Sequence, residues 1–153
     1  LRYYFFMLLK NEGDTEKLAK RLVKLSKKDN TVICLIGDLG SGKTTFARYF
    51  IRNFFKNSKI KEIPSPTFTL LQVYEHDTHT INHYDFYRLK NSSELFELNF
   101  SEAVTDDICL IEWSDKFEEI LPNDRIEINF QIKSKVSRSV QITLRGKFKN
   151  QKY

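Results

Sequence analysis

The pattern of apolar positions divides the chain into buried strands and amphipathic helices. Residues Val32–Ile36 and 108–111 are apolar at every position, which is typical of strands covered on both faces of a sheet. Apolar residues recur every three or four positions over 15–28, where Asp14 is the expected N-cap, and again over 44–55. Strands that alternate with helices in this way favour an α/β domain.

Further strands are expected near both ends and in the middle of the chain. Aromatic residues, which favour strands, fill Tyr3–Leu9, so this segment is expected to be a first or edge strand. Strands over 68–74 and 79–84 are expected to pair as a hairpin, and alternation over 126–132 and 140–144 predicts another, antiparallel hairpin with one solvated face. Short helices are expected over 92–98 and 114–121. The sequence therefore predicts a mixed sheet with flanking helices and a C-terminal antiparallel hairpin.

Length and composition fit one folded domain that carries positive charge. The chain has 153 residues, of which 41% are hydrophobic and 29% charged, so a single domain over 1–153 is expected. The basic tail 146–153 is expected to be flexible. A net charge of +5 fits either a solvated basic surface or attraction to RNA, a nucleotide or an acidic partner, and charge alone does not choose among these.

The sequence gives no indication of a membrane span, a secretion signal or a disulfide framework. The longest apolar run, 3–9, is far shorter than the ~20 residues that a span needs, and no small-residue cleavage pattern follows it. Cys34 and Cys109 lie inside apolar runs, where each is expected to be a small buried hydrophobe. This pattern fits a reducing compartment, so a cytoplasmic protein without membrane contact is expected.

One glycine-rich stretch carries the strongest chemical signal. Residues 37–46 read GDLGSGKTTF and directly follow an apolar strand, and Gly37, Gly42, Lys43 and Thr44 match the P-loop pattern G-x-x-x-x-G-K-[ST]. Glycines let the backbone curl so that N–H groups converge on an anion, and the helix that follows adds the positive end of its dipole. Lys43 is expected to reach the β- and γ-phosphates of a nucleotide, and the Thr44 hydroxyl to ligate Mg²⁺.

A P-loop protein also needs an acid for the metal, at the end of a neighbouring apolar strand. Glu112 follows the apolar run 108–111 directly, and Asp85 follows the expected strand over 79–84, so both are candidates. The three histidines, at 76, 79 and 83, have no cysteine nearby and match no standard zinc spacing, so a zinc site is not expected.

Four stretches together resemble the TsaE family, the bacterial ATPases required for making threonylcarbamoyladenosine in tRNA. GDLGSGKTTF is followed by SPTFTL (65–70), HYDFYRL (83–89) and LIEW (110–113), in the order and spacing of the family. The resemblance covers nearly the whole chain and implies a P-loop NTPase-like fold. One departure is Asn99, where the family usually has glycine. Asparagine is the non-glycine residue that best tolerates a left-handed backbone.

The resemblance also implies roles for individual residues. Lys43, Asp85 and Glu112 would be catalytic, and Thr44 would hold Mg²⁺ together with Glu112 and Asp85. One of the two acids would orient the attacking water, and Thr67 would lie in a switch segment beside the γ-phosphate. The residues implied in binding ATP are Gly37, Asp38, Leu39, Gly40, Ser41, Gly42, Lys43, Thr44, Thr45, Thr67, Thr15 and Arg138, the last two at the base or ribose.

The partners that the resemblance implies are the TsaB and TsaD proteins. TsaD transfers the threonylcarbamoyl group to the adenosine next to the anticodon, and hydrolysis by TsaE would reset that complex, so contact with tRNA would be indirect. The sequence offers no assured arginine finger, a group worth roughly 10³–10⁵ in rate, and Arg88 is the nearest candidate. Weak intrinsic hydrolysis that rises when partners are added is therefore expected. Trp113 would lie either near the site or in the core.

Three other functions use the same phosphate loop. A small-molecule P-loop kinase would need an acceptor pocket and usually an arginine-bearing lid, and no stretch between the motifs holds several arginines. A GTPase switch generally carries an N/T-K-x-D motif, which does not occur here. A non-catalytic, nucleotide-dependent interaction module would bind ATP and change shape without turnover.

Overall fold

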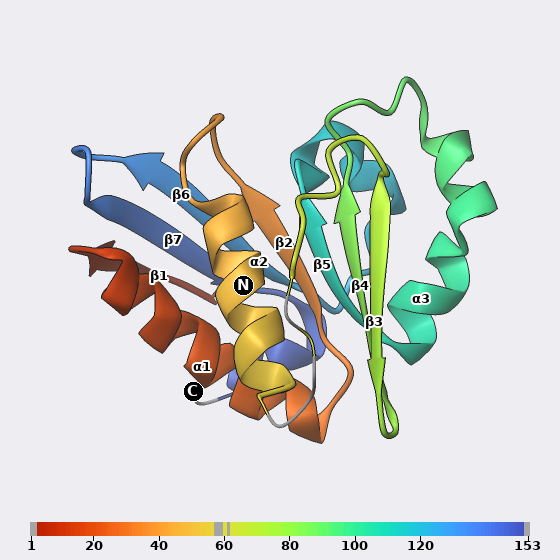
Figure 1. Cartoon of the computed structure of the whole chain (residues 1–153), viewed down its shortest axis with the longest axis horizontal. Coiled ribbons are helices and arrows are strands. Elements are labelled where there is room, and N and C mark those ends of the chain that lie inside the picture. The colour runs from red at the N-terminus through yellow and green to blue at the C-terminus, as the bar shows by residue number, and fades with distance from the viewer. Residues whose placement is uncertain (1–2, 57–59, 61, 152–153) are drawn as a thin grey trace.

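A seven-stranded mixed sheet organises the chain (Figure 1). The computed structural model describes residues 3–56, 60 and 62–151. The strands are β1 (Tyr3–Leu9), β2 (Val32–Ile36), β3 (Leu71–His76), β4 (His79–Asp85), β5 (Ile108–Glu112), β6 (Ile126–Ile132) and β7 (Arg138–Leu144). The α-helices are α1 (Glu12–Lys28), α2 (Lys43–Phe54) and α3 (Phe100–Asp106), and the 3₁₀ helices are η1 (Ser92–Leu98), η2 (Ser114–Ile120) and η3 (Gly146–Asn150).

Parallel strands form the centre of the sheet and antiparallel strands form its edges. The order is β1-β7-β6-β2-β5-β4-β3, in which β2 runs parallel to both β5 and β6, and β4 runs parallel to β5. The predicted hairpins are both present, β3 with β4 and β6 with β7. The predicted mixed α/β architecture is therefore confirmed, and β1 lies at an edge as expected, paired with β7 alone.

Helices cover the two faces of the sheet, and this explains the continuously apolar strands. In β2, Ile33 and Leu35 face the cluster built around α1 and α2, while Val32 and Cys34 belong to the opposite cluster beside α3. Figure 1 shows α1 and α2 side by side over one face of the sheet. The two thiols, Cys34 and Cys109, are buried and free, as predicted, and burial raises the pKa of Cys34 to about 12.

The structure corrects the predicted start of two elements. Helix α1 begins at Glu12, and its N-cap is Asn11 rather than Asp14, because the Asn11 side chain accepts the amide hydrogen of Asp14 at 3.0 Å. The Asp14 carboxylate reaches back to the amide of Lys10 at 2.8 Å. Strand β3 begins at residue 71 rather than 68, because the chain turns just before it and Leu70 is left-handed, with a φ of 67°.

Two further segments are α3, which packs against the sheet on the face opposite α1 and α2, and the C-terminal helix η3. Helix α3 was not predicted; it follows Asn99, whose left-handed backbone (φ 53°) joins η1 to α3 as the substitution for glycine implied. In the tail, η3 carries Phe148, which is fully buried, and the Lys147 amide donates to Asp124, while the expected flexibility of 146–153 stays a prediction. Residues 152–153 lie outside the described part of the chain. Among the described residues, no helix has the length and apolar content to cross a membrane.

Candidate functional site

The glycine-rich loop joins the end of β2 to the start of α2, and its glycines are required by geometry. Gly37 has a φ of 146° and Gly42 a φ of 116°, both in the region that side chains rarely adopt. A Cβ atom on Gly37 would lie 2.7 Å from the carbonyl oxygen of Phe130, so no larger residue fits. The chain thus turns back sharply after β2 and delivers the N-terminus of α2 to the carboxyl end of the parallel strands.

Arg138 braces this loop from behind. Its Nε donates to the carbonyl oxygen of Ser41 at 3.0 Å and its Nη2 to that of Gly40 at 3.2 Å. In a trans peptide unit the carbonyl and the N–H point in opposite directions, so the Gly42 amide is turned away from Arg138. The structure therefore places Arg138 against the loop backbone, and its contact with a base or ribose stays a prediction.

Lys43 lies inside the loop. Its Nζ donates to the carbonyl oxygens of Gly37, at 2.5 Å, and Asp38, at 2.8 Å, and it lies 4.1 Å from the centre of the Trp113 ring. Burial lowers the pKa of the Lys43 ammonium, and the negative charge of Glu112 opposes this shift. Trp113 therefore belongs to the site, as one wall around the lysine.

The two candidate acids stand side by side because β4 and β5 are parallel neighbours with Asp85 opposite Glu112. Glu112 Oε1 accepts the hydroxyl of Thr44 at 2.5 Å, which ties the end of β5 to the start of α2. Asp85 accepts the Thr67 hydroxyl at 3.2 Å and the Tyr87 amide at 2.9 Å. Burial is the main reason that the pKa of Asp85 is raised, and the neighbouring Glu112 charge adds to it.

These groups converge on one small cavity. It has a volume of about 150 Å³ and a lining that combines loop backbone, hydroxyls, the lysine and both acids. The lining residues are Leu39, Gly40, Ser41, Gly42, Lys43, Thr44, Thr45, Thr67, Asp85, Glu112 and Trp113. The structure thus brings together the predicted loop, Thr67, for which a switch role is predicted, and the two acids. These come from four separate stretches of the chain.

The donor set suits a hydrated magnesium ion that is bound together with phosphates. Mg²⁺ prefers oxygen ligands and is usually held by one or two carboxylates plus the phosphates of its substrate, rather than by a cage of protein ligands. Thr44 and Glu112 offer a hydroxyl and a carboxylate within 2.5 Å of each other, and Asp85 stands beside them. Among the described residues, no group of three His, Cys, Asp or Glu side chains is placed to hold a metal by itself, so the nucleotide would complete the coordination.

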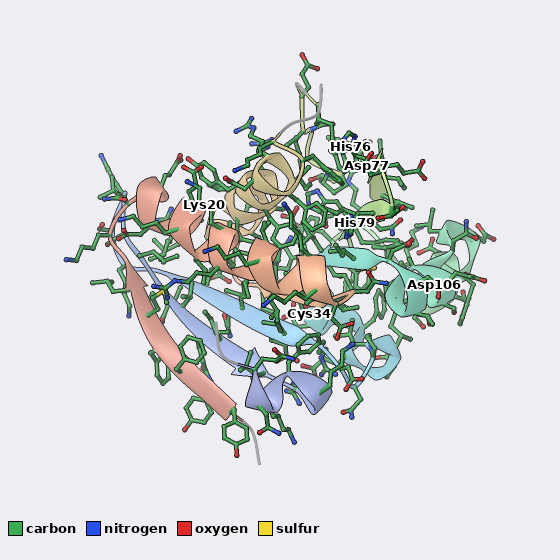
Figure 2. The ribbon with its side chains drawn as sticks, turned by 90° about the horizontal axis from the view of Figure 1, so that it is seen from below. Lys20, Cys34, His76, Asp77, His79 and Asp106 are labelled. Carbon is green, nitrogen blue, oxygen red and sulfur yellow. The ribbon has the colours of Figure 1, made fainter. Side chains whose placement is uncertain are left out.

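Some predicted residues do not line this cavity: Gly37, Asp38 and Arg138 belong to the loop or contact it from outside, and Thr15 and Arg88 lie apart. Thr15 is buried in the first turn of α1 and does not line the cavity, so its contact with a nucleotide stays a prediction. The guanidinium of Arg88 lies 4.2 Å from the centre of the Phe68 ring, in a cation–π contact. Of the three histidines, His76 and His79 lie at the β3–β4 turn (Figure 2).

The third histidine is the functional-site residue that the sequence reasoning missed. His83 is fully buried and its Nε2 lies 2.6 Å from Glu112 Oε2. The signal was present in the sequence: His83 and Asp85 are two positions apart on one strand, so both side chains lie on the face of the sheet that carries the site.

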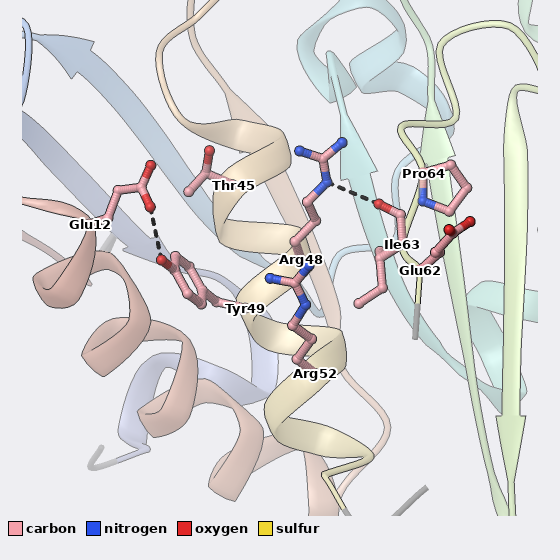
Figure 3. A pocket seen from close by; sticks show the side chains of 8 residues that line it. All are labelled: Glu12, Thr45, Arg48, Tyr49, Arg52, Glu62, Ile63 and Pro64. Carbon is pink, nitrogen blue, oxygen red and sulfur yellow. Dashed lines mark hydrogen bonds between the residues drawn. The ribbon is translucent and has the colours of Figure 1, made fainter. Parts of the chain in front are cut away.

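A larger cavity, of about 450 Å³, lies along the outer face of α2 (Figure 3). Arg48 crosses it to donate to the carbonyl oxygen of Ile63 at 2.9 Å, and Tyr49 donates to Glu12 at 2.9 Å. Thr45 is the residue that it shares with the loop cavity. Its lining holds Arg48 and Arg52 together with Glu12 and Glu62, so its charge is mixed.

The site has the features of a P-loop nucleotide-binding protein. A glycine loop with left-handed residues follows a buried strand, it encloses a lysine, and two acids lie at the ends of adjacent strands. Comparison with known proteins assigns the family. The family model "Threonylcarbamoyl adenosine biosynthesis protein TsaE" matches residues 9–140. The chain belongs to the TsaE family, which acts in the biosynthesis of threonylcarbamoyladenosine in tRNA.

Curated relatives and a solved structure agree with this assignment. The TsaE protein of Rickettsia felis is 45% identical over 82% of this chain and 72% of its own length, and that of Haemophilus influenzae is 39% identical over 74% and 71%. The TsaE protein of Bacillus subtilis is 33% identical over 89% of this chain and 83% of its own. The crystal structure of Bacillus subtilis YdiB superposes with a TM-score of 0.72 at 28% identity, covering 95% of this chain and 88% of that one.

Proposed function

We propose that this protein is a Mg²⁺-dependent ATPase, slow on its own, that supports a TsaB–TsaD complex in making threonylcarbamoyladenosine next to the anticodon of tRNA. The observation that carries the proposal is the convergence of Lys43, Thr44, Asp85 and Glu112 on the glycine loop within one cavity. A site for phosphate binding alone would need the loop and the lysine, but not two adjacent carboxylates.

Each residue has a role that follows from its position. The loop amides and the Lys43 ammonium would bind the β- and γ-phosphates, and Lys43 would stabilise the charge that develops on them. Thr44 and Glu112 would hold Mg²⁺, which when bound neutralises phosphate charge. Asp85, whose raised pKa makes it a better proton acceptor than an ordinary carboxylate, would orient the attacking water.

Slow intrinsic hydrolysis follows from what the cavity lacks. None of the described residues that line it is an arginine, and Arg88 is held against Phe68 outside that lining. An arginine supplied to such a site is worth roughly 10³–10⁵ in rate. A partner protein would therefore accelerate turnover, either with a group of its own or by releasing Arg88 toward the nucleotide.

The segment around Thr67 would couple the nucleotide to the partner. The Thr67 hydroxyl is hydrogen-bonded to Asp85 at 3.2 Å and to the Ser65 hydroxyl at 2.8 Å. Pro64 and Pro66 lie on either side of Ser65, just before Thr67 in the chain. A γ-phosphate beside Asp85 would compete for the Thr67 hydroxyl, and the segment would shift as a unit because its prolines restrict the backbone. The TsaB–TsaD complex would sense this shift.

The test is a hydrolysis assay with purified TsaB–TsaD from the same organism. We expect slow, Mg²⁺-dependent phosphate release from the protein alone, and an increase of severalfold or more when the complex is added. The Lys43→Ala variant should release none above background in either case. Magnesium-dependent ATP binding without release, alone or with the complex, would instead identify a non-catalytic interaction module. Phosphate transfer to an added small acceptor would identify a kinase.

A further inference from the structure

His83 lies directly behind the acid that ends β5. The imidazole is fully buried, and its Nε2 is 2.6 Å from Glu112 Oε2. The other carboxylate oxygen, Oε1, accepts the Thr44 hydroxyl at 2.5 Å. The Glu112 carboxylate is therefore fixed at both oxygens, by donors from β4 and from the first turn of α2.

The hydrogen-bond pattern selects one tautomer of this histidine. Nδ1 of His83 is buried and has no hydrogen-bond partner among the described residues. A carboxylate oxygen only accepts hydrogen bonds, so the ring nitrogen beside Glu112 must carry a hydrogen, and the unpaired Nδ1 need not carry one. The tautomer with its hydrogen on Nε2 meets both conditions, because that hydrogen is donated to Glu112 and Nδ1 keeps its lone pair.

We propose that His83 is a positioning residue for the magnesium site: through its Nε2–H it holds the Glu112 carboxylate in the orientation that presents Oε1 to Thr44. The inference rests on the proposed role of Glu112 and Thr44 as the residues that hold Mg²⁺. Hydrogen bonds behind a metal-binding carboxylate fix its orientation, and losing one typically costs 10- to 100-fold in metal affinity or activity.

The sheet makes this arrangement rigid. His83 pairs in register with Leu110 on β5 and with Gln72 on β3, so its backbone is held on both sides. A carboxylate at the end of a strand can rotate about its side-chain bonds. The donor from β4 restricts that rotation, which leaves Glu112 preorganised when a nucleotide arrives with its metal.

A pair of substitutions separates the hydrogen bond from the volume of the ring. In His83→Gln, the side-chain amide nitrogen reaches about as far as Nε2 and keeps a donor for Glu112. In His83→Leu, similar volume is kept and the donor is removed. The readout is binding of the non-hydrolysable ATP analogue adenylyl imidodiphosphate by isothermal titration calorimetry, over a series of MgCl₂ concentrations and in EDTA.

The expected result is a defect that depends on magnesium. Binding in EDTA should be the same for wild type and both variants, because the loop and Lys43 are intact. His83→Leu should need roughly 10- to 100-fold more MgCl₂ than wild type to reach the same affinity, and His83→Gln should restore most of the loss. A His83→Leu protein with the wild-type magnesium requirement, or a His83→Gln protein as impaired as His83→Leu, would overturn the proposal.

If His83→Leu does not fold, a measurement on the unmodified histidine tests whether its Nε2–H is donated to Glu112. In protein labelled with ¹⁵N-histidine, the His83 ring should show a hydrogen-bonded Nε2–H that is protected from solvent exchange and changes in Glu112→Ala. A hydrogen on Nδ1 instead would overturn the proposal. These readouts measure binding and tautomer state, and they do not measure hydrolysis. A wild-type protein that binds Mg²⁺ and the analogue but never hydrolyses ATP would therefore refute the proposed ATPase activity and leave this inference standing.

Discussion

The Thr44 hydroxyl donates to Glu112 Oε1 across 2.5 Å and so joins the first turn of α2 to the end of β5. These residues are far apart in the chain, and the sequence predicted each of them separately as a residue of the metal site. Together they place a hydroxyl and a carboxylate at the mouth of the glycine loop, beside Asp85. This contact supports the proposal that the site holds magnesium together with a nucleotide.

Glu112→Gln should separate nucleotide binding from turnover. The amide keeps the shape of the side chain but removes the negative charge that would attract Mg²⁺, so phosphate release should fall by roughly 10²–10³ while binding in EDTA persists. The exposed Glu119→Gln, on η2, is the matched control and should behave as wild type. Turnover measured at saturating ATP checks this, and an unchanged rate in Glu112→Gln would exclude Glu112 from the mechanism.

Asp85→Asn should stabilise the nucleotide-free protein at neutral pH while it lowers activity. Burial raises the pKa of Asp85 in the native state above its ordinary 3.8. At a pH between 3.8 and this raised pKa, the native state therefore binds more protons than the unfolded state. The free energy of unfolding contributed by this group therefore falls as the pH rises through that window. The uncharged asparagine side chain removes the cost of burying the charge, and its oxygen can still accept the hydrogen of the Tyr87 backbone amide.

Thermal unfolding across a pH series measures this effect. Asp85→Asn should unfold at a higher temperature than wild type at neutral pH, and the difference should shrink as the pH drops toward the ordinary pKa of the carboxyl. A difference between the two proteins that is constant with pH would show that the charge of Asp85 costs the fold nothing.

Gly37→Ala should destabilise the fold by at least ~2 kcal/mol, because it combines a φ of 146° with a Cβ placed 2.7 Å from the Phe130 carbonyl. Gly40→Ala is the matched control in the same loop. Its φ of 75° is also left-handed, but a Cβ there meets no atom within 4 Å, so only the conformational cost of about 1–2 kcal/mol remains. Urea denaturation compares the two variants. Equal destabilisation would mean that backbone conformation, and not the contact with β6, makes Gly37 necessary.

Local sequence patterns predicted the strands and the loop, because those features depend on neighbouring residues. The buried strand before Gly37 and the helix after Gly42 follow from apolar spacing alone, and the free buried thiols follow from their apolar surroundings. The start of α1 failed for a local reason: Asn11 and Asp14 both suit a helix N-terminus, and only the geometry shows that Asn11 is the cap.

Features that depend on distant residues could not be predicted in the same way. Arg138 lies 97 positions from Ser41 along the chain, and only the sheet order brings β7 close enough for it to brace the loop. The bond from His83 to Glu112 likewise needs β4 beside β5, a pairing that single-sequence patterns do not specify. Helix α3 was missed because its seven residues offer too little periodicity.

The central claim is that the loop around Lys43 binds a magnesium nucleotide, and titration of Mg–ATP into the folded protein by calorimetry tests it most directly. We predict saturable binding at one site that is lost in Lys43→Ala and retained in Lys20→Ala, an exposed lysine on α1 (Figure 2). Absence of any binding heat to folded wild type, or identical binding by Lys43→Ala, would contradict the account.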